Sequence, residues 1–382
     1  MKQRLAYIDI AKGVAMTAVV LLHVDYAFDR EGWLPLWSLL GNAWHVCVFF
    51  MLSGFFVKNE RLFEPRSFLA GKIRLLYGPL IAIYVVVLLL HNELIRIGFY
   101  HLGTDYGGKV MQWFSVPDFF RHLGEAVLLA GREPLLAPLW FCSVLILAFL
   151  LLCLLSNALR RWLPVGCSPK VFERVRFSLI LVACILAHLF SQVWDLNIPR
   201  CNNTFTALWL ILCGYVVYNR LHMQFDNGWM ALGCAAGVYG LTVLFGPNIL
   251  ITNDYHNVIS LTLCSFSALY SICFVARKIE NTWVGKGVAW LGRHSFAIMA
   301  LHLLAFQVAA LALRLTVDSS QPQGLLNPVT NQSLLLLAYY TLAGVLLPAF
   351  AATALAWLRR QIEAFRGRHG CHRTLSDDTP YD

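Results

Sequence analysis

Runs of about 20 apolar residues recur along the chain, and a run of that length lets an α-helix cross the hydrocarbon core of a bilayer. Hydrophobic residues make up 58% of the 382 residues and charged residues only 13%, about half the share of a typical soluble domain. The pattern predicts an all-α, polytopic membrane helical bundle of about ten transmembrane helices. The predicted spans lie near residues 6–27, 36–57, 74–95, 139–156, 177–195, 204–219, 229–246, 257–275, 291–315 and 333–358.

The Lys and Arg residues between these spans predict the topology. With the N-terminus placed inside, 22 of them fall on inner segments and 7 on outer segments. Cytoplasmic loops carry such an excess, so both termini are predicted to be cytoplasmic. Residues 1–358 then form the transmembrane domain, and residues 359–382 form a flexible, basic cytoplasmic tail. No small-residue cleavage site follows the first apolar run, so it is interpreted as a retained helix.

Charge and cysteine content exclude several other classes of protein. The net charge of +9 would suggest nucleic acid in a soluble chain, but here the basic residues lie between apolar runs, where anionic lipid can satisfy them. We therefore expect membrane lipids, and no nucleic acid, as partners. Only Cys201 lies in an outer loop, which disfavours an outer disulfide within the chain. No metal is expected, since the His and Cys residues at 369–372 form only a weak ligand pattern.

The longest outer segment, residues 96–138, mixes charged, aromatic, Gly and Pro residues. Residues 117–130 are predicted to form a short helix on the outer interface, because they combine apolar and charged side chains. Long loops over a cavity often bind substrate, which would make this loop an acceptor-selecting element. The alternative, a simple linker, fits the sequence equally well.

The first span carries three ionisable residues, Asp9, Lys12 and His23. Such residues are costly inside a membrane and usually functional. Lys12 and His23 are eleven residues apart, so they project from one face of a helix, about 16 Å apart along its axis. Asp9 lies one turn from Lys12 and can pair with it. One helix face would thus carry a cation near the cytoplasm and an imidazole near the outer leaflet. An ion pair in the first turn plus an interfacial histidine is the structural alternative.

Further polar residues occur in later spans. His45 lies near the outer end of the second span and could face His23 or be a hydrogen-bonded core residue. Lys72 and Arg74 open the third span from inside, either as positive-inside residues or as an anion site. His188, His294 and His302 are interpreted as structural, and Trp140 as part of the outer aromatic belt. Ser53 and Gly54 are expected to permit close helix packing.

Four stretches occur in order along most of the chain: RLAYIDIAKGVAMTAVVLLHV from residue 4, WHVCVFFMLSGFFVK from 44, KIRLLYGP from 72 and WLGRHSFAIMALHLL from 290. Together they resemble the membrane acyltransferase-3 family, and within it the sugar O-acetyltransferase branch that includes fucose 4-O-acetylase-like proteins. Two positions depart from the family pattern. Lys12 stands where much of the family has Arg, and Cys47 where relatives often have Pro. These departures weaken a bidentate phosphate contact and a helix kink, respectively.

The resemblance implies a transmembrane O-acyltransferase in a bacterial inner membrane. It implies cytoplasmic acyl-CoA, usually acetyl-CoA, as donor, and a sugar, exopolysaccharide or lipid-linked glycan as outer acceptor. Lys12, Lys72 and Arg74 would bind the anionic head of the donor, and His23 would act as general base. His45, which could orient the acceptor, and Asp9 are the other predicted catalytic residues. A covalent acyl-histidine step would also fit. A proton-coupled transporter or flippase and a non-catalytic export subunit are the alternatives, and acyl-CoA dependence separates them from an enzyme.

Overall fold

The computed structural model describes residues 5–24, 43–103, 110–164, 166–193, 200–316 and 334–370. Its regular secondary structure is helical, and the isolated β-bridge between Ile249 and Asp254 joins two turns of the 246–257 loop. The helices are α1 (Ala6–Val24), α2 (His45–Phe55), α3 (Asn59–Leu62), α4 (Pro65–Lys72), the π-helical η3 (Ile73–Tyr77), α5 (Gly78–Arg96), α6 (Val116–Val127), the 3₁₀ helix η4 (Pro134–Leu139), α7 (Trp140–Trp162), α8 (Pro169–Gln192), α9 (Cys201–Tyr215), the π-helical η5 (Val216–Arg220), α10 (Gly228–Phe245), α11 (Val258–Ile279), α12 (Trp283–Arg293), α13 (Ser295–Thr316) and α14 (Leu334–Gly370).

Nine helical segments of the described ranges are long and apolar enough to cross a bilayer, from Ala6–Val24 to Leu334–Ala364. The predicted span 36–57 corresponds to α2, which is apolar but has only 11 residues. Residues 36–42 lie outside the described residues. The prediction of an all-α, polytopic membrane bundle is therefore confirmed, and the chain is a multi-pass integral membrane protein.

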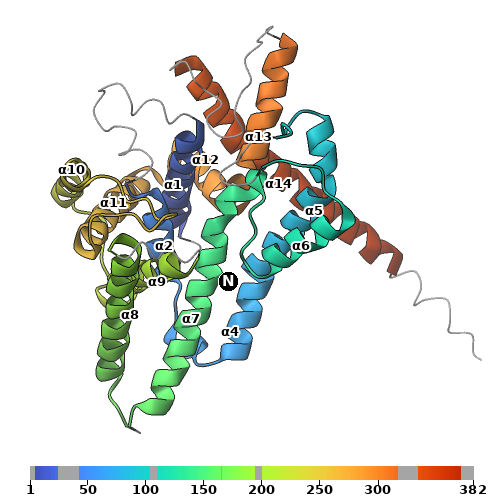
Figure 1. Ribbon diagram of the computed structural model, residues 1–382. Coiled ribbons are helices and arrows are strands. Elements are labelled where there is room, and N and C mark those ends of the chain that lie inside the picture. The colour runs from blue at the N-terminus through green and yellow to red at the C-terminus, as the bar shows by residue number, and fades with distance from the viewer. Residues whose placement is uncertain are drawn as a thin grey trace, which may run out of the picture.

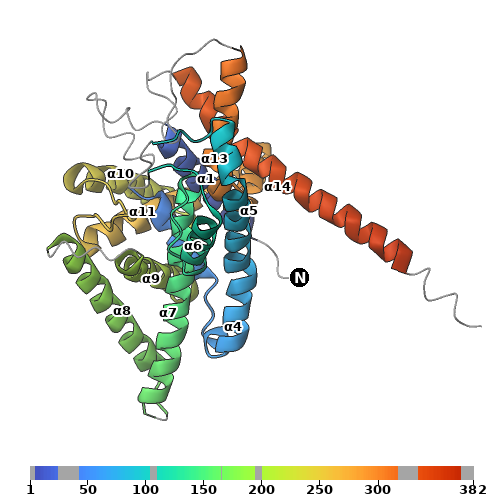
Figure 2. The ribbon, with the colours of Figure 1, turned by 45° about the vertical axis from the view of Figure 1, so that its right-hand side comes forward.

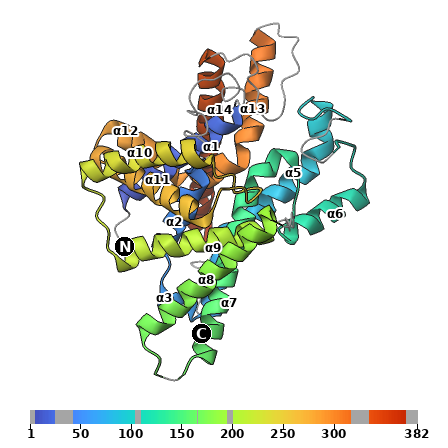
Figure 3. The same cartoon turned by 60° about the vertical axis from the view of Figure 1, so that its left-hand side comes forward.

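Helices α1 and α9 are the most buried of the nine segments and form the centre of the bundle. Helix α1 packs against α12, α11, α14, α2 and α13, whereas α9 packs against α2, α8 and α7. Figures 1 and 3 show α10 and α11 side by side, with α5 and α6 forming a second pair elsewhere in the bundle. The ends of α1 and α2 that carry the candidate histidines thus lie among buried elements.

Two helix contacts bring backbones unusually close. A methyl group at Gly13 of α1 would overlap the carbonyl oxygen of Val288, and one at Gly292 of α12 would overlap the carbonyl oxygen of Asp9. The α2–α9 contact is built the same way, because Gly54 lies against the Ile211 carbonyl. Small residues permit this approach between helices in lipid. The close packing expected at Gly54 is therefore confirmed.

The structure refines two predictions, the short helix at 117–130 and the domain boundary at 358. A short helix was predicted at 117–130, and α6 covers Val116–Val127 with Ser115 as its N-cap in a capping box with Asp118. Helix α14 continues to Gly370, past the predicted domain boundary at 358, and its C-terminal part extends away from the bundle as a rod in Figure 2. Residues 371–382 of the predicted tail lie outside the described residues.

The inside location of both termini remains a prediction, and cysteine labelling tests it. In a cysteine-free background, a cysteine at Arg121 on α6 should react with an impermeant maleimide in intact cells. A cysteine at Arg66 on α4 should react only after the membrane is opened, because its loop carries the excess of basic residues. Both side chains are exposed in the structure, so a difference in labelling would reflect the side of the membrane and not burial of one position. Labelling of position 66 from outside would contradict the topology.

Candidate active site

His23 and His45 line one cavity of about 180 Å³. His23 lies at the C-terminal end of α1 and His45 is the first residue of α2, so both project from the same end of the bundle. The remaining wall comes from α1, α2, the η4–α7 junction, residues 248–251 and Met299 of α13. His23, which the sequence predicts on the same face of α1 as Lys12, thus lies at a cavity within the bundle.

The backbone of α1 fixes the tautomer of His23. Its Nδ1 lies 2.7 Å from the carbonyl oxygen of Val19, one turn earlier in the helix. A carbonyl oxygen only accepts hydrogen bonds, so Nδ1 carries the proton of the neutral ring and donates it to Val19. The lone pair therefore lies on Nε2, the nitrogen that a general base uses.

A third imidazole, His302 of α13, lies beside His23. The two ring centroids are 5.0 Å apart, and the His302 side chain is 0% exposed. Its Nδ1 donates to the Ile298 carbonyl at 2.9 Å, while Nε2 is buried without a hydrogen-bond partner. Nothing in the sequence spacing links His302 with His23, because α1 and α13 are brought together only by the fold.

His45 completes the group of histidines at the cavity. Its side chain is 6% exposed, and its Nδ1 is buried with no hydrogen-bond partner. The residues before α2 are held by Asn248, whose Nδ2 donates to the Ala43 carbonyl at 2.8 Å. Among the described residues, His23 and His45 are the two histidines that line the cavity, and His302 lies behind His23.

The outer segment reaches this cavity through a buried polar anchor that sequence reasoning missed. Glu133 is 1% exposed, accepts a hydrogen bond from the Tyr100 hydroxyl and lies against His91, whose Nδ1 is 3.4 Å away. Glu133 directly precedes η4, and η4 leads to Pro138 and Trp140, which line the cavity. Trp140 is therefore part of the cavity wall. A pair such as His91 and Glu133 carries no sequence signal, since the two residues belong to separate elements.

The basic residues predicted for the donor lie in two places. Lys12 is half-buried, and its Nζ lies 5.2 Å from the centroid of the Phe56 ring, at the C-terminal end of α2. Lys72 belongs to α4, and its Nζ is 3.3 Å from the centroid of the Phe149 ring of α7. Arg74 is exposed in η3. Figures 1 and 2 show α4 along α7 and away from α1, so Lys72 and Arg74 belong to a different part of the bundle from Lys12.

Asp9 lies where α1 meets α12, and its side chain is buried. It lies more than two helical turns from the residues of α1 that line the histidine cavity and about one turn from Lys12. This position suits a role in stabilising the N-terminal half of α1. Asp9 does not line the cavity that His23 and His45 share.

Arg176, one of the basic residues between the predicted spans 139–156 and 177–195, is buried in the structure. Arg176 of α8 is 1% exposed, and its Nη1 donates to Asn59 at 3.0 Å and to Ser156 at 3.3 Å. Asn59 also donates to Glu173, which accepts from the Tyr215 hydroxyl at 2.8 Å. This network joins the segment after α2 to α7, α8 and α9 on the side predicted to be cytoplasmic.

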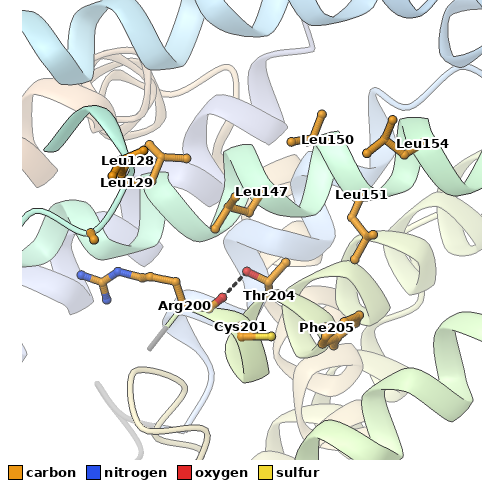
Figure 4. Close-up of a pocket in the computed structure, with 11 residues that line it drawn as sticks. Leu128, Leu129, Leu147, Leu150, Leu151, Leu154, Arg200, Cys201, Thr204 and Phe205 are labelled. Carbon is orange, nitrogen blue, oxygen red and sulfur yellow. Dashed lines mark hydrogen bonds between the residues drawn. The ribbon is translucent and has the colours of Figure 1, made fainter. Parts of the chain in front are cut away.

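A second cavity, of about 400 Å³, runs between α7 and α9 (Figure 4). Leu147, Leu151 and Leu154 of α7 line it, with Arg200 as the only charged side chain on its described wall. It is larger than the histidine cavity, but its described wall contains no His, Asp or Glu. Such a wall suits hydrocarbon chains and offers no general base, so the histidine cavity is the candidate active site.

Comparison with curated proteins and with solved structures gave no match. Comparison with protein families matched one sequence profile, described as an acyltransferase domain, over residues 5–357. That range includes both faces of the histidine cavity and all nine membrane-crossing segments except the end of the last. The chain belongs to the acyltransferase-3 family and is a membrane acyltransferase.

Proposed function

We propose that the protein transfers an acetyl group from cytoplasmic acetyl-CoA to a hydroxyl group of a glycan or glycolipid at the outer face of the membrane. The single observation that carries this proposal is the shared cavity of His23 and His45, at one end of a helix that also carries Lys12. Family membership supports acyl transfer as the reaction. The cavity contains histidines that could act as the general base.

In the proposed reaction, Nε2 of His23 takes the proton of the acceptor hydroxyl. The oxygen attacks the thioester carbonyl, the carbon–sulfur bond breaks, and the CoA sulfur leaves as a thiol after it takes up the proton. A neutral imidazole with its lone pair on Nε2 suits this role near pH 7. His45, with an unpartnered Nδ1, would orient the acceptor, and the ring of His302 would support that of His23.

The donor is proposed to approach from the opposite end of α1. Lys12 is separated from His23 by about 16 Å along the helix, so its ammonium could hold phosphate while the thioester reaches the cavity. Lys72 and Arg74 would contribute through the local positive charge near the inner surface, since they lie against α7 and not beside α1. The cavity volume of about 180 Å³ favours a short acyl group.

Reconstituted vesicles test the proposal directly. Protein of known orientation is given acetyl-CoA labelled in the acetyl group on its inner side, and surface glycan from cells that lack the protein on its outer side. We expect label to appear in the glycan as alkali-labile ester, with CoA released on the inner side. A transporter would move substrate without cleaving the thioester. Intact acetyl-CoA after prolonged incubation, with unlabelled glycan, would contradict the proposal.

A further inference from the structure

A polar pocket of about 420 Å³ lies beside the histidine cavity and has no role in the reaction proposed above. It is formed by the C-terminal ends of α8 and α10 and by the loop that leads to α11, and its wall is mostly polar. The lining residues are His188, Gln192, Phe245, Pro247, Asp254, Tyr255 and His256.

His188 brings a largely buried ring to this pocket. Its side chain is 8% exposed, and among the described residues its Nδ1 has no hydrogen-bond partner. Its ring stacks on Tyr255 with centroids 4.4 Å apart, so the ring is held in place while Nδ1 stays unsatisfied. The His188 ring thus forms a fixed, polar part of the pocket wall.

The chemistry of the wall favours a neutral, hydroxyl-rich ligand. Asp254 offers a carboxylate acceptor, His188 and His256 offer ring nitrogens, and the Phe245–His256 stack offers a flat aromatic surface. Among the described lining residues there is no Lys or Arg, which disfavours an anion. In the described ranges, these side chains do not form a group of three that could hold a metal ion. Convergent polar groups with aromatic rings at a pocket wall suit a sugar.

One loop separates this pocket from the histidine cavity. Residues 248–251 line the histidine cavity, and residues 254–256 line the polar pocket. Ile249 and Asp254 exchange two backbone hydrogen bonds, of 2.7 and 3.0 Å, so the two cavities lie on either side of a narrow, paired strip of backbone. Asn253 fixes this strip from inside, because its Oδ1 accepts from Thr206 at 2.7 Å and its Nδ2 donates to Ser191 at 3.2 Å.

We propose that the polar pocket between α8, α10 and the 246–257 loop is a glycan subsite, which binds the sugar next to the one that is acylated in the histidine cavity. This inference rests on the proposed function in that the acceptor is a glycan. Acceptors of two or more sugars then gain affinity from the pocket, and a monosaccharide does not.

The test compares acceptors of different length. Surface glycan from cells that lack the protein is cleaved into mono-, di- and tetrasaccharides, and transfer to each is measured with the reconstituted protein. In Asp254→Ala and His188→Ala, the KM for di- and tetrasaccharides should rise about tenfold, as expected for the loss of a hydrogen bond to a charged or buried group. The KM for the monosaccharide and for acetyl-CoA should stay unchanged. Thr252→Ala is the control for a change in the loop backbone, because Thr252 lines neither cavity but its hydroxyl donates to the Ile249 carbonyl at 3.2 Å.

Calorimetric binding of the disaccharide without donor separates this inference from the proposed function. If the unaltered protein binds the disaccharide and Asp254→Ala binds it about tenfold more weakly, the subsite stands even where no acetyl transfer occurs. Asp254 has an exposed side chain, so its removal does not empty the core as the removal of His188 could. Equal disaccharide affinity in the unaltered protein and Asp254→Ala, or no binding to the unaltered protein, would overturn the proposal. An equal rise in KM for the monosaccharide would also overturn it.

Discussion

His23→Ala is expected to abolish acyl transfer while the protein stays folded and still binds donor. The substitution removes the Nε2 lone pair from the cavity shared with His45, and loss of a general base costs about 10²- to 10⁴-fold in rate. Donor binding should persist because the donor head is proposed to lie near Lys12, about 16 Å away along α1. Transfer of labelled acetyl groups to glycan and equilibrium binding of acetyl-CoA would be measured on the same purified sample.

His294→Ala is the matched control for this experiment. His294 donates through Nδ1 to the Trp290 carbonyl at 2.8 Å, one turn earlier, as His23 does to Val19. Its Nε2 lies 3.2 Å from the Thr353 hydroxyl, and it does not line the histidine cavity. We expect His294→Ala to retain transfer activity. A folded His23→Ala variant that acylates at the normal rate would refute the proposed base.

Lys12→Ala is expected to lower transfer by about 10- to 100-fold, since a hydrogen bond to a charged group contributes about 1.5–3 kcal/mol. Lys12→Arg should retain much of the activity because it keeps the positive charge at the same turn of α1. The loss in Lys12→Ala should appear mainly as a higher KM for acetyl-CoA, measured at a saturating concentration of glycan.

Lys278 provides a comparison for Lys12. Its Nζ lies 5.4 Å from the centroid of the Phe274 ring, a contact similar to that of Lys12 with Phe56 at 5.2 Å. Lys278 is exposed on α11 and has no part in the proposed donor path, so Lys278→Ala should leave the KM for acetyl-CoA unchanged. Full activity of Lys12→Ala at limiting donor would show that the ammonium of Lys12 serves packing alone.

The sequence predicted the features of the fold that depend on local patterns. Apolar runs located the membrane helices, and the eleven-residue spacing placed His23 on a defined face of α1, because helix geometry is regular. The place of His23 and His45 at one cavity could be anticipated because α1 and α2 are consecutive spans that meet at one end. The short outer helix was predicted within a few residues for the same local reasons.

Features that depend on contacts between distant segments could not be predicted. The place of His302 beside His23 results from the packing of α13 on α1, and the burial of Arg176 results from the meeting of α7, α8 and α9. In sequence, Arg176 is one of several cations before a span and has no distinguishing pattern. The place of Lys72 could not be predicted either, because a basic residue at this point of the sequence could face α1 or α7. Its contact with the Phe149 ring shows that it faces α7.

The interlocked glycines of α1 and α12 have a mechanical consequence. The backbones of α1 and α12 approach so closely at Gly13 and Gly292 that any larger residue at either position would push the two helices apart. Because α1 carries both Lys12 and His23, such a change would move both side chains together, although neither substitution lies at the histidine cavity. The seating of α1 on α12 therefore depends on two residues that have no side chain.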